Sequence, residues 1–277
     1  MPSTVYSMLV LMAETVHEKI LEDDELLLTF SEQQVRSLLD STHTNHGGVS
    51  YAEAVWQGQV SLEGNITNRK DAHDLSLSRE SWHMSVFCLP MIYTNEGTFV
   101  LLMQRTGGGR DNHSSTFTPP CGHVMNGNSP RQETMTELMA EGGVSQDLLS
   151  QEPILTGVVG RESIDSGKNR VNREVVFCSV ATINTDLSPE MLLQDLLASS
   201  GIDSNEVKGL ALVRLEHLME VYTAEDESQR NAGMQIILDY HIDPLTNQIA
   251  RSANGTHMPM RGTAAVIAAQ IAGQIVG

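Results

Sequence analysis

The sequence is poor in cysteine. Its three cysteines, Cys88, Cys121 and Cys178, each lie in or beside an apolar segment that we expect to be a strand. This arrangement predicts reduced, buried thiols in a cytoplasmic protein rather than a disulfide framework. His123 follows Cys121 by two residues, but no second pair of metal ligands has suitable spacing. The sequence therefore gives little support to zinc or to a nucleophilic cysteine.

Basic residues are also scarce. The 277 residues include 17 Lys and Arg against 35 Asp and Glu, which gives a net charge of −18. Residues 1–100 and 181–277 carry net charges of −9 and −7, whereas residues 101–180 carry −2. Such a charge repels a phosphate backbone, so we expect no extended nucleic-acid surface. The middle segment is where a small phosphate ligand would be held.

Long hydrophobic runs are absent as well. The apolar run Met8–Met12 is short and no basic residue precedes Lys19, so we expect no signal peptide. Residues 263–277 are apolar, but they include two glutamines and are fewer than the roughly 20 that a membrane helix needs. We therefore expect no membrane partner, and a C-terminal helix that docks on a core or on another chain.

The segment Gly122–Val144 contains acidic residues in helical register. Glu133, Glu137 and Glu141 are four residues apart, which places three carboxylates on one face of a helix. Like charges so placed destabilise an isolated helix unless a cation lies among them. The alternatives are a solvated acidic face and a metal site.

The boundaries of this helix are marked in the sequence. Ser129 suits its cap, Pro130 suits its first turn, and Gly142 and Gly143 are expected to end it. Two apolar strands precede it, Trp82–Tyr93 and Thr98–Arg105, joined by a tight turn. A glycine-rich loop at 107–111 and the sequence Pro-Pro-Cys-Gly then lead to the helix.

Together these features resemble the Nudix hydrolase family. The family signature is a glycine, five residues, Glu, seven residues, Arg-Glu, an aliphatic residue, any residue, Glu-Glu, any residue, Gly and an aliphatic residue. The matching positions are Gly122, Glu137, Leu138, Glu141, Gly143 and Val144. Three positions differ: Asn128 replaces the first Glu, Thr136 replaces Arg, and Ala140 replaces the first Glu of the closing pair.

The resemblance implies an α/β fold over residues 80–242, a Nudix-type α/β/α sandwich with a mixed central sheet. It implies hydrolysis of a nucleoside diphosphate linked to another group, with Mg²⁺ or Mn²⁺ as cofactor. Metal ligands are expected at Glu137, Glu141 and a main-chain carbonyl of Cys121 or Gly122. Glu133, one turn before Glu137, is a further candidate ligand, and we expect it to compensate in part for Ala140.

Later positions extend the resemblance. A strand at Val175–Ile183 and an acid followed by a strand at Asn205–Leu218 are similar to later parts of the family fold. Glu206 is the first candidate for a catalytic acid that reaches metal or water, and Glu174 is the second. Basic residues expected to hold the non-reacting phosphate lie in or beside loops around the helix: Arg105, Arg110, Arg161, Lys168, Arg170 and Arg173. For any single one, ordinary surface charge is the alternative.

The rest of the chain is expected to form appendages. Residues 1–79 are predicted as an extension with helices at Thr4–Leu21 and Ser31–Leu39 and a strand at Ala54–Leu62. Within residues 80–242, further amphipathic helices are expected at Leu187–Ser199 and Ser228–Tyr240, the second closing the Nudix-type sandwich. Residues 243–277 are predicted as a tail with an apolar helix. The extension or the tail could form a homo-oligomer.

Two functions compete. The first is a Nudix-type pyrophosphohydrolase acting on a nucleotide-type small molecule. The second is a catalytically degenerate Nudix domain that serves as a ligand-binding, structural or assembly module. The surviving glycine and glutamate positions favour the first, and the three departures favour the second.

Overall fold

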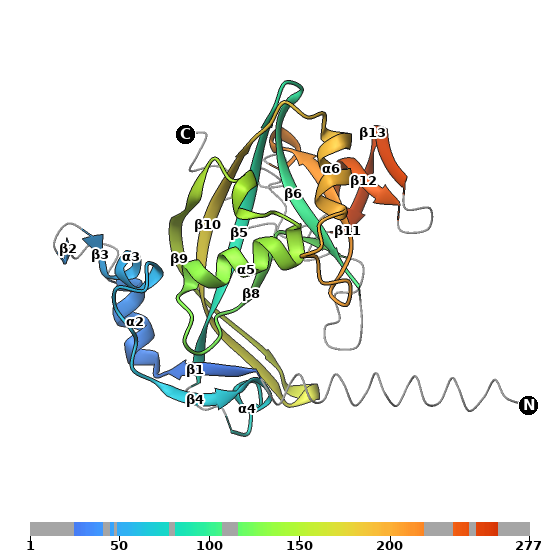
Figure 1. The fold of residues 1–277 in the computed structure, drawn as a ribbon. Coiled ribbons are helices and arrows are strands. Elements are labelled where there is room, and N and C mark those ends of the chain that lie inside the picture. Colours follow the sequence, from blue (N-terminus) through green and yellow to red (C-terminus); the bar gives the residue numbers. More distant parts are fainter. Residues whose placement is uncertain are drawn as a thin grey trace, which may run out of the picture. The chain divides into compact units, whose positions relative to one another are not determined.

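The structure, a computed structural model, describes residues 25–40, 45–46, 49–77, 81–106, 116–218, 235–243 and 248–259 (Figure 1). These residues form two compact units. The first takes those within Met1–Ser85, His123–Pro130 and Val158–Val176, and the second those within Val86–Gly122, Arg131–Gly157 and Phe177–Gly277. The predicted helices at 4–21 and 263–277, and Arg110, lie outside the described residues. The domain boundaries after residues 79 and 242 stay predictions.

The second unit is built on an antiparallel sheet. Its strands follow the order β13 (Gln248–Pro259), β12 (Gln235–Asp243), β11 (Val207–Arg214), β6 (Gly97–Arg105) and β5 (Trp82–Thr94). The short strand β7 (Phe117–Thr118) pairs with β6. β10 (Arg170–Asn184) pairs with β5 and with β9 (Gln151–Asp165). The α/β class predicted from the sequence is confirmed, with a large antiparallel sheet and few helices.

The predicted strand–turn–strand segment is confirmed as the β5–β6 hairpin. Thr94 pairs with Gly97, so Asn95 and Glu96 form a two-residue loop. Gly97 has φ of 136°, a backbone conformation that residues with a Cβ rarely adopt. The glycine therefore permits the tight connection between two buried strands.

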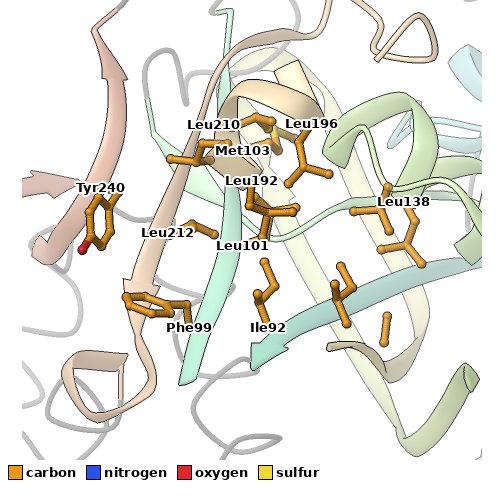
Figure 2. Close-up of a cluster of buried hydrophobic side chains, with 14 of the residues drawn as sticks. Ile92, Phe99, Leu101, Met103, Leu138, Leu192, Leu196, Leu210, Leu212 and Tyr240 are labelled. Atoms are coloured by element: carbon orange, nitrogen blue, oxygen red, sulfur yellow. The ribbon is translucent and has the colours of Figure 1, made fainter. Parts of the chain in front are cut away.

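Two helices pack on this sheet and bury its apolar face (Figure 2). α5 (Pro130–Gly142) contributes Leu138, and α6 (Pro189–Leu197) contributes Leu192 and Leu196. They meet Leu101 of β6 and Leu212 of β11 in one cluster of fully buried side chains. Each such leucine contributes about 1.5–3 kcal/mol to the free energy of unfolding. The expected helix at Leu187–Ser199 is confirmed, and the hydroxyl of Ser188 caps it by accepting a hydrogen bond from the Met191 N–H.

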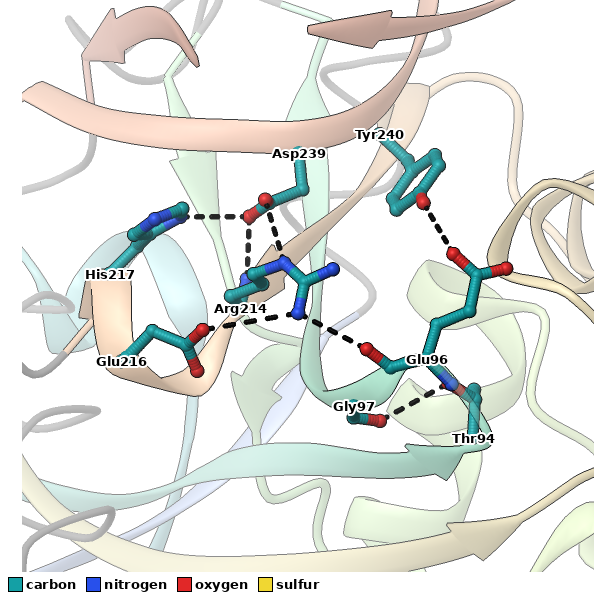
Figure 3. Close-up of polar contacts among 8 residues, drawn as sticks. All are labelled: Thr94, Glu96, Gly97, Arg214, Glu216, His217, Asp239 and Tyr240. Carbon is teal, nitrogen blue, oxygen red and sulfur yellow. Dashed lines mark hydrogen bonds and ion pairs between the residues drawn. The ribbon is translucent and has the colours of Figure 1, made fainter. Parts of the chain in front are cut away.

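A polar network joins the β5–β6 turn to β11 and β12 in the same unit (Figure 3). Asp239 accepts hydrogen bonds from the main-chain N–H of Arg214 at 2.8 Å and pairs with His217 Nδ1 at 3.0 Å. The Arg214 guanidinium lies 3.3 Å from Asp239 Oδ1 and donates to the Glu96 carbonyl at 3.1 Å. Tyr240 donates to Glu96 Oε2 at 3.0 Å. Charged side chains thereby link three segments of the second unit.

The first unit has its own strands and short helices. β1 (Leu26–Phe30) pairs antiparallel with β4 (Asn65–Asn68) and with the start of β5. The helices are α2 (Glu32–Asp40), α3 (Tyr51–Trp56) and α4 (Arg69–Ala72). A small hairpin pairs β2 (Asn45–His46) with β3 (Val49–Ser50). The helix predicted at Ser31–Leu39 is confirmed as α2. Strand β8 (Cys121–His123) has residues in both units.

Two local predictions are wrong. The segment Ala54–Leu62, predicted as a strand, begins inside helix α3, because the Ser50 hydroxyl accepts a hydrogen bond from the Glu53 N–H and caps that helix. The segment Ser228–Tyr240, predicted as a helix, is strand β12 from Gln235 onward, and its residues 228–234 lie outside the described residues. In β12 the buried residues Leu238, Tyr240 and Ile242 alternate with more exposed ones, which is the period of a strand. Within the described part of the chain, no helix is long and apolar enough to cross a membrane.

Candidate functional site

The acidic side chains of α5 do not form a solvated helix face. Glu133 is 3% exposed and Glu141 is 1% exposed, while Glu137 is half-buried. Burying a carboxylate is costly unless hydrogen bonds or a cation compensate. The solvated-face interpretation is therefore wrong for Glu133 and Glu141, and a reason for their burial is required.

Glu141 is fixed by one of its two oxygens. The main-chain N–H of Cys121 donates to Glu141 Oε2 at 2.6 Å. Glu141 Oε1 is buried and has no hydrogen-bond partner among the described residues. Burial raises the pKa of Glu141 well above its ordinary value, and the nearby charge of Glu137 raises it further. An oxygen held in place, buried and unpaired suits a carboxylate that coordinates a cation.

Glu137 lies against the turn that precedes the helix. A Cβ placed on Gly122 would lie 1.8 Å from Glu137 Oε1. Two atoms that are not bonded to each other cannot approach so closely. Glycine at position 122 is thus required for the observed position of the Glu137 carboxylate. Because Cys121 holds Glu141 and Gly122 adjoins Glu137, both glutamates converge on the same two residues of β8.

A second segment brings Glu206 to this site. Thr106 donates its main-chain N–H to the Glu206 carbonyl at 3.0 Å, and Val207 pairs with Arg105 in the β6–β11 ladder. The N–H of Asp203 donates to the Ala140 carbonyl of α5 at 2.8 Å. The turn that carries Glu206 is therefore attached to β6 on one side and to the helix on the other.

The charges of these groups act on one another. The negative charge of Glu206 adds to that of Glu137 in raising the pKa of Glu141. Arg105 acts in the opposite sense and lowers it. Three carboxylates and one guanidinium therefore share one electrostatic environment within the second unit. Glu206 is the exposed member of the set.

Within the second unit, the structure brings together five of the residues selected from the sequence. The residues that meet are Gly122, Glu137, Glu141, Glu206 and Arg105. Arg173 lies in the first unit, where its Nε is 2.9 Å from Glu162 Oε1, and Arg161 and Glu174 lie in that unit as well. Glu133 shares the helix and is buried, and its role stays a prediction.

The departures from the family signature also have structural counterparts. The hydroxyl of Thr136 donates to the Gln132 carbonyl of its own helix at 3.3 Å, so its side chain bonds within α5. Ala140 has no ligand atom in its side chain, but its carbonyl anchors the turn at Asp203. The sequence does not indicate this anchor, because a main-chain bond leaves no residue-type signal.

The donor set fits a hard divalent cation. The converging groups are carboxylate oxygens beside the main chain of Cys121 and Gly122, and oxygen ligands are preferred by Mg²⁺ and Mn²⁺. The unpaired Glu141 Oε1 is the observation that favours such an ion over a purely structural role. The Cys121 N–H that donates to Glu141 Oε2 holds this carboxylate in one orientation.

Comparison with known proteins finds no matching family model and no matching curated protein sequence. Among solved structures, the chain is similar to a MutT/nudix family protein from Enterococcus faecalis, at 18% identity and a TM-score of 0.39, covering 86% of this chain and 73% of that one. It is similar to a MutT protein from Methanosarcina mazei Go1, at 19% identity and a TM-score of 0.35, covering 50% and 81%. A third is the Nudix domain of Shewanella oneidensis NrtR complexed with ADP ribose, at 19% identity and a TM-score of 0.30. That alignment covers 37% of this chain and 61% of the Shewanella domain.

Proposed function

We propose that this chain is a Nudix-type hydrolase that cleaves the pyrophosphate of a nucleoside diphosphate linked to another group, with Mg²⁺ or Mn²⁺. The observation that carries the proposal is the convergence of Glu137 and Glu141 on the Cys121–Gly122 turn, with one buried carboxylate oxygen unpaired. Glu137, Glu141 and the Gly122 carbonyl would hold the ion, and Glu133 would assist them. When bound, such an ion neutralises charge on the pyrophosphate and lowers the pKa of a coordinated water.

The protein's own groups then have separate tasks. Cys121 keeps Glu141 in one orientation through its N–H, and Gly122 leaves room for Glu137. Glu206 is exposed and lies in the field of the other carboxylates, so it is the candidate to accept a proton from the attacking water. Arg105 supplies the positive charge that would hold a non-reacting phosphate. Arg110 and Arg173 stay predictions from the sequence for substrate binding.

The test compares wild type with Glu137→Gln, Glu141→Gln and the double variant on a panel of nucleoside diphosphate derivatives with Mg²⁺ or Mn²⁺. Glutamine keeps the size of each side chain and removes its charge. Asp195→Asn, which removes an exposed carboxylate from α6 in the same unit, is the matched control. We expect the control to keep wild-type turnover. We expect turnover to fall in each glutamate variant by more than about 10- to 100-fold, which is the usual effect of removing a group that only orients a metal ligand.

The second candidate is a degenerate domain that binds such a ligand without cleaving it. Thr136 favours it, because the Thr136 hydroxyl bonds to Gln132 and does not orient a glutamate. Ala140 favours it too, because its side chain offers no ligand. If wild type binds Mn²⁺ or a nucleotide but turns over no compound faster than the double variant, this second function replaces the first.

A further inference from the structure

Three histidines from three separate segments of the chain meet inside the first unit. His73 follows helix α4, His83 lies on β5 and His123 ends β8. The ring centroids of the three pairs are 5.0, 5.3 and 4.9 Å apart. One nitrogen from each ring lies within 4.8 Å of the other two. His73 and His83 are buried and His123 is half-buried.

The ring nitrogens of these histidines are unusually short of partners. Both nitrogens of His83 and Nδ1 of His73 are buried without a hydrogen-bond partner in the described structure. Leaving a buried polar atom unpaired typically costs about 1–3 kcal/mol. The His83 side chain is fully buried, so solvent does not offset this cost. Packing these three rings together without a ligand would therefore destabilise the first unit.

Polar side chains beside the cluster hold two of the rings in place, as groups that bond to metal-binding histidines commonly do. His73 Nε2 lies 3.1 Å from Asn172 Oδ1, and with its proton on Nε2 the unpaired Nδ1 presents a lone pair. His123 Nε2 lies 3.6 Å from Glu174 Oε1, and Glu174 also lies 3.3 Å from Arg161. A histidine that binds a metal through one nitrogen commonly gives the other to a carbonyl or a carboxylate.

The protonation states agree with this arrangement. Burial lowers the pKa of His73 to about 4 and that of His83 well below its ordinary value, with the neighbouring His123 as a second cause in both. Neutral imidazole is the form that coordinates metals.

We propose that His73, His83 and His123 form a binding site for one divalent transition-metal ion of the Zn²⁺ class. Imidazole nitrogens suit Zn²⁺, and three histidines with a fourth position left to water form a known type of zinc coordination. Zn–N bonds of about 2.0–2.1 Å in a tetrahedron place ligand nitrogens about 3.4 Å apart. The rings therefore need to approach by little more than about 1 Å. The ion would join α4, β5 and β8, so it would stabilise the first unit.

The test is a Zn²⁺ titration by calorimetry, with Co²⁺ absorption as a second probe of nitrogen coordination. It is run in the Glu137→Gln/Glu141→Gln background, because the carboxylates of the second unit could also take Zn²⁺. Failure of the hydrolase proposal would leave this result unaffected. The main variant is His83→Leu, which removes an unpaired buried group and is expected to fold at least as well without metal. His217→Gln, which changes a histidine of the second unit paired with Asp239, is the matched control.

We expect one Zn²⁺ per chain, visible d–d bands for Co²⁺, and a rise in Tm on adding Zn²⁺. In His83→Leu, the Zn²⁺ affinity should fall by more than about 100-fold, and Zn²⁺ should no longer raise Tm. In Asn172→Leu, the Zn²⁺ affinity should fall by about 10- to 100-fold. His73→Leu provides a second ligand variant should His83→Leu fail to fold. The proposal is overturned if the background protein binds no Zn²⁺, or if a folded His83→Leu or His73→Leu variant binds it as tightly.

Discussion

The absence of a Cβ at Gly122 determines where the Glu137 carboxylate lies. The Glu137 carboxylate occupies the space that any Cβ at residue 122 would need. The obstructing group is the end of a flexible side chain, so the fold can tolerate a methyl group there by moving Glu137. A substitution at Gly122 should therefore displace the Glu137 carboxylate and leave the free energy of unfolding nearly unchanged.

Gly122→Ala should therefore separate function from stability. We expect Tm to change little, because Glu137 can swing away, while turnover or Mn²⁺ affinity falls by about 10- to 100-fold or more. Thermal unfolding and a Mn²⁺ titration of the same preparation measure both effects. Gly157→Ala is the control, because nothing lies within 4 Å of a Cβ at that position. Equal Mn²⁺ affinity in Gly122→Ala and wild type would contradict the assignment of Glu137 as a ligand.

The three cysteines differ in a way that alkylation can detect. Cys88, Cys121 and Cys178 form no disulfide, as predicted, and burial raises the pKa of Cys88 and Cys178 to about 12. At pH 8 these two thiols are protonated as well as buried, so they should resist iodoacetamide until the protein unfolds. Cys121 is half-buried and should react first. Mass spectrometry of partly labelled protein identifies the order, and early labelling of Cys88 would contradict the described core.

At the scale of the element, the end of α5 decides where the site is built. Gly143 has φ of 67°, and the N–H groups of Gly143 and Val144 bond to the carbonyls of Met139 and Leu138. A left-handed glycine is a common way to end a helix and turn the chain. Here it directs Val144 into the core, where it is fully buried, about one turn after Glu141 and two turns after Glu137.

Gly143→Ala should destabilise the protein strongly. The left-handed backbone alone costs about 1–2 kcal/mol for a residue with a Cβ. That Cβ would also lie 2.3 Å from the Leu196 carbonyl oxygen, which is backbone and cannot move freely. We expect a loss of about 3 kcal/mol or more, measured by denaturant unfolding. Gly127→Ala is the matched control: φ is 97° there, but nothing lies within 4 Å of the added Cβ. The same loss in both variants would show that the contact with Leu196 contributes nothing.

The network between β11 and β12 gives a second prediction at this scale. Asp239→Ala removes the acceptor for the Arg214 main-chain N–H and the partner of His217 (Figure 3). Because Asp239 is largely buried, we expect a loss of about 1–3 kcal/mol in the free energy of unfolding. Urea unfolding measures this loss, and Asp195→Ala, which changes an exposed residue of α6, is the control. An unchanged urea midpoint in Asp239→Ala would mean that the network does not stabilise the pairing of β11 with β12.

At the scale of the whole molecule, local patterns predicted the elements around the site well. Ser129 and Pro130, the β5–β6 turn and the three-glutamate spacing each carry their signal within a few residues, so the hairpin and α5 were predicted close to their observed bounds. Val55 and Trp56 favour a strand by their β-propensity, whereas the cap at Ser50 makes this segment part of helix α3. Strand β12 was missed because its alternation is short and follows a segment with helical spacing.

Long-range contacts were beyond the sequence. The pairing of β6 with β11, which sets Glu206 beside Arg105, joins positions about a hundred residues apart. The meeting of His73, His83 and His123 is of the same kind, because no spacing rule links residues from three separate segments. The sequence likewise does not show that Arg173 pairs with Glu162. An arginine looks the same in the sequence whether it binds a phosphate or forms an ion pair.

The central claim concerns hydrolysis at the Glu137–Glu141 site, and the most direct measurement is the initial rate of nucleoside monophosphate release. The rate is measured with nucleoside diphosphate derivatives and saturating Mn²⁺, for wild type and for Glu137→Gln/Glu141→Gln. We predict that wild type releases the monophosphate from at least one compound, and that the double variant is slower by more than about 100-fold. Equal rates for the two proteins on every compound would contradict the account.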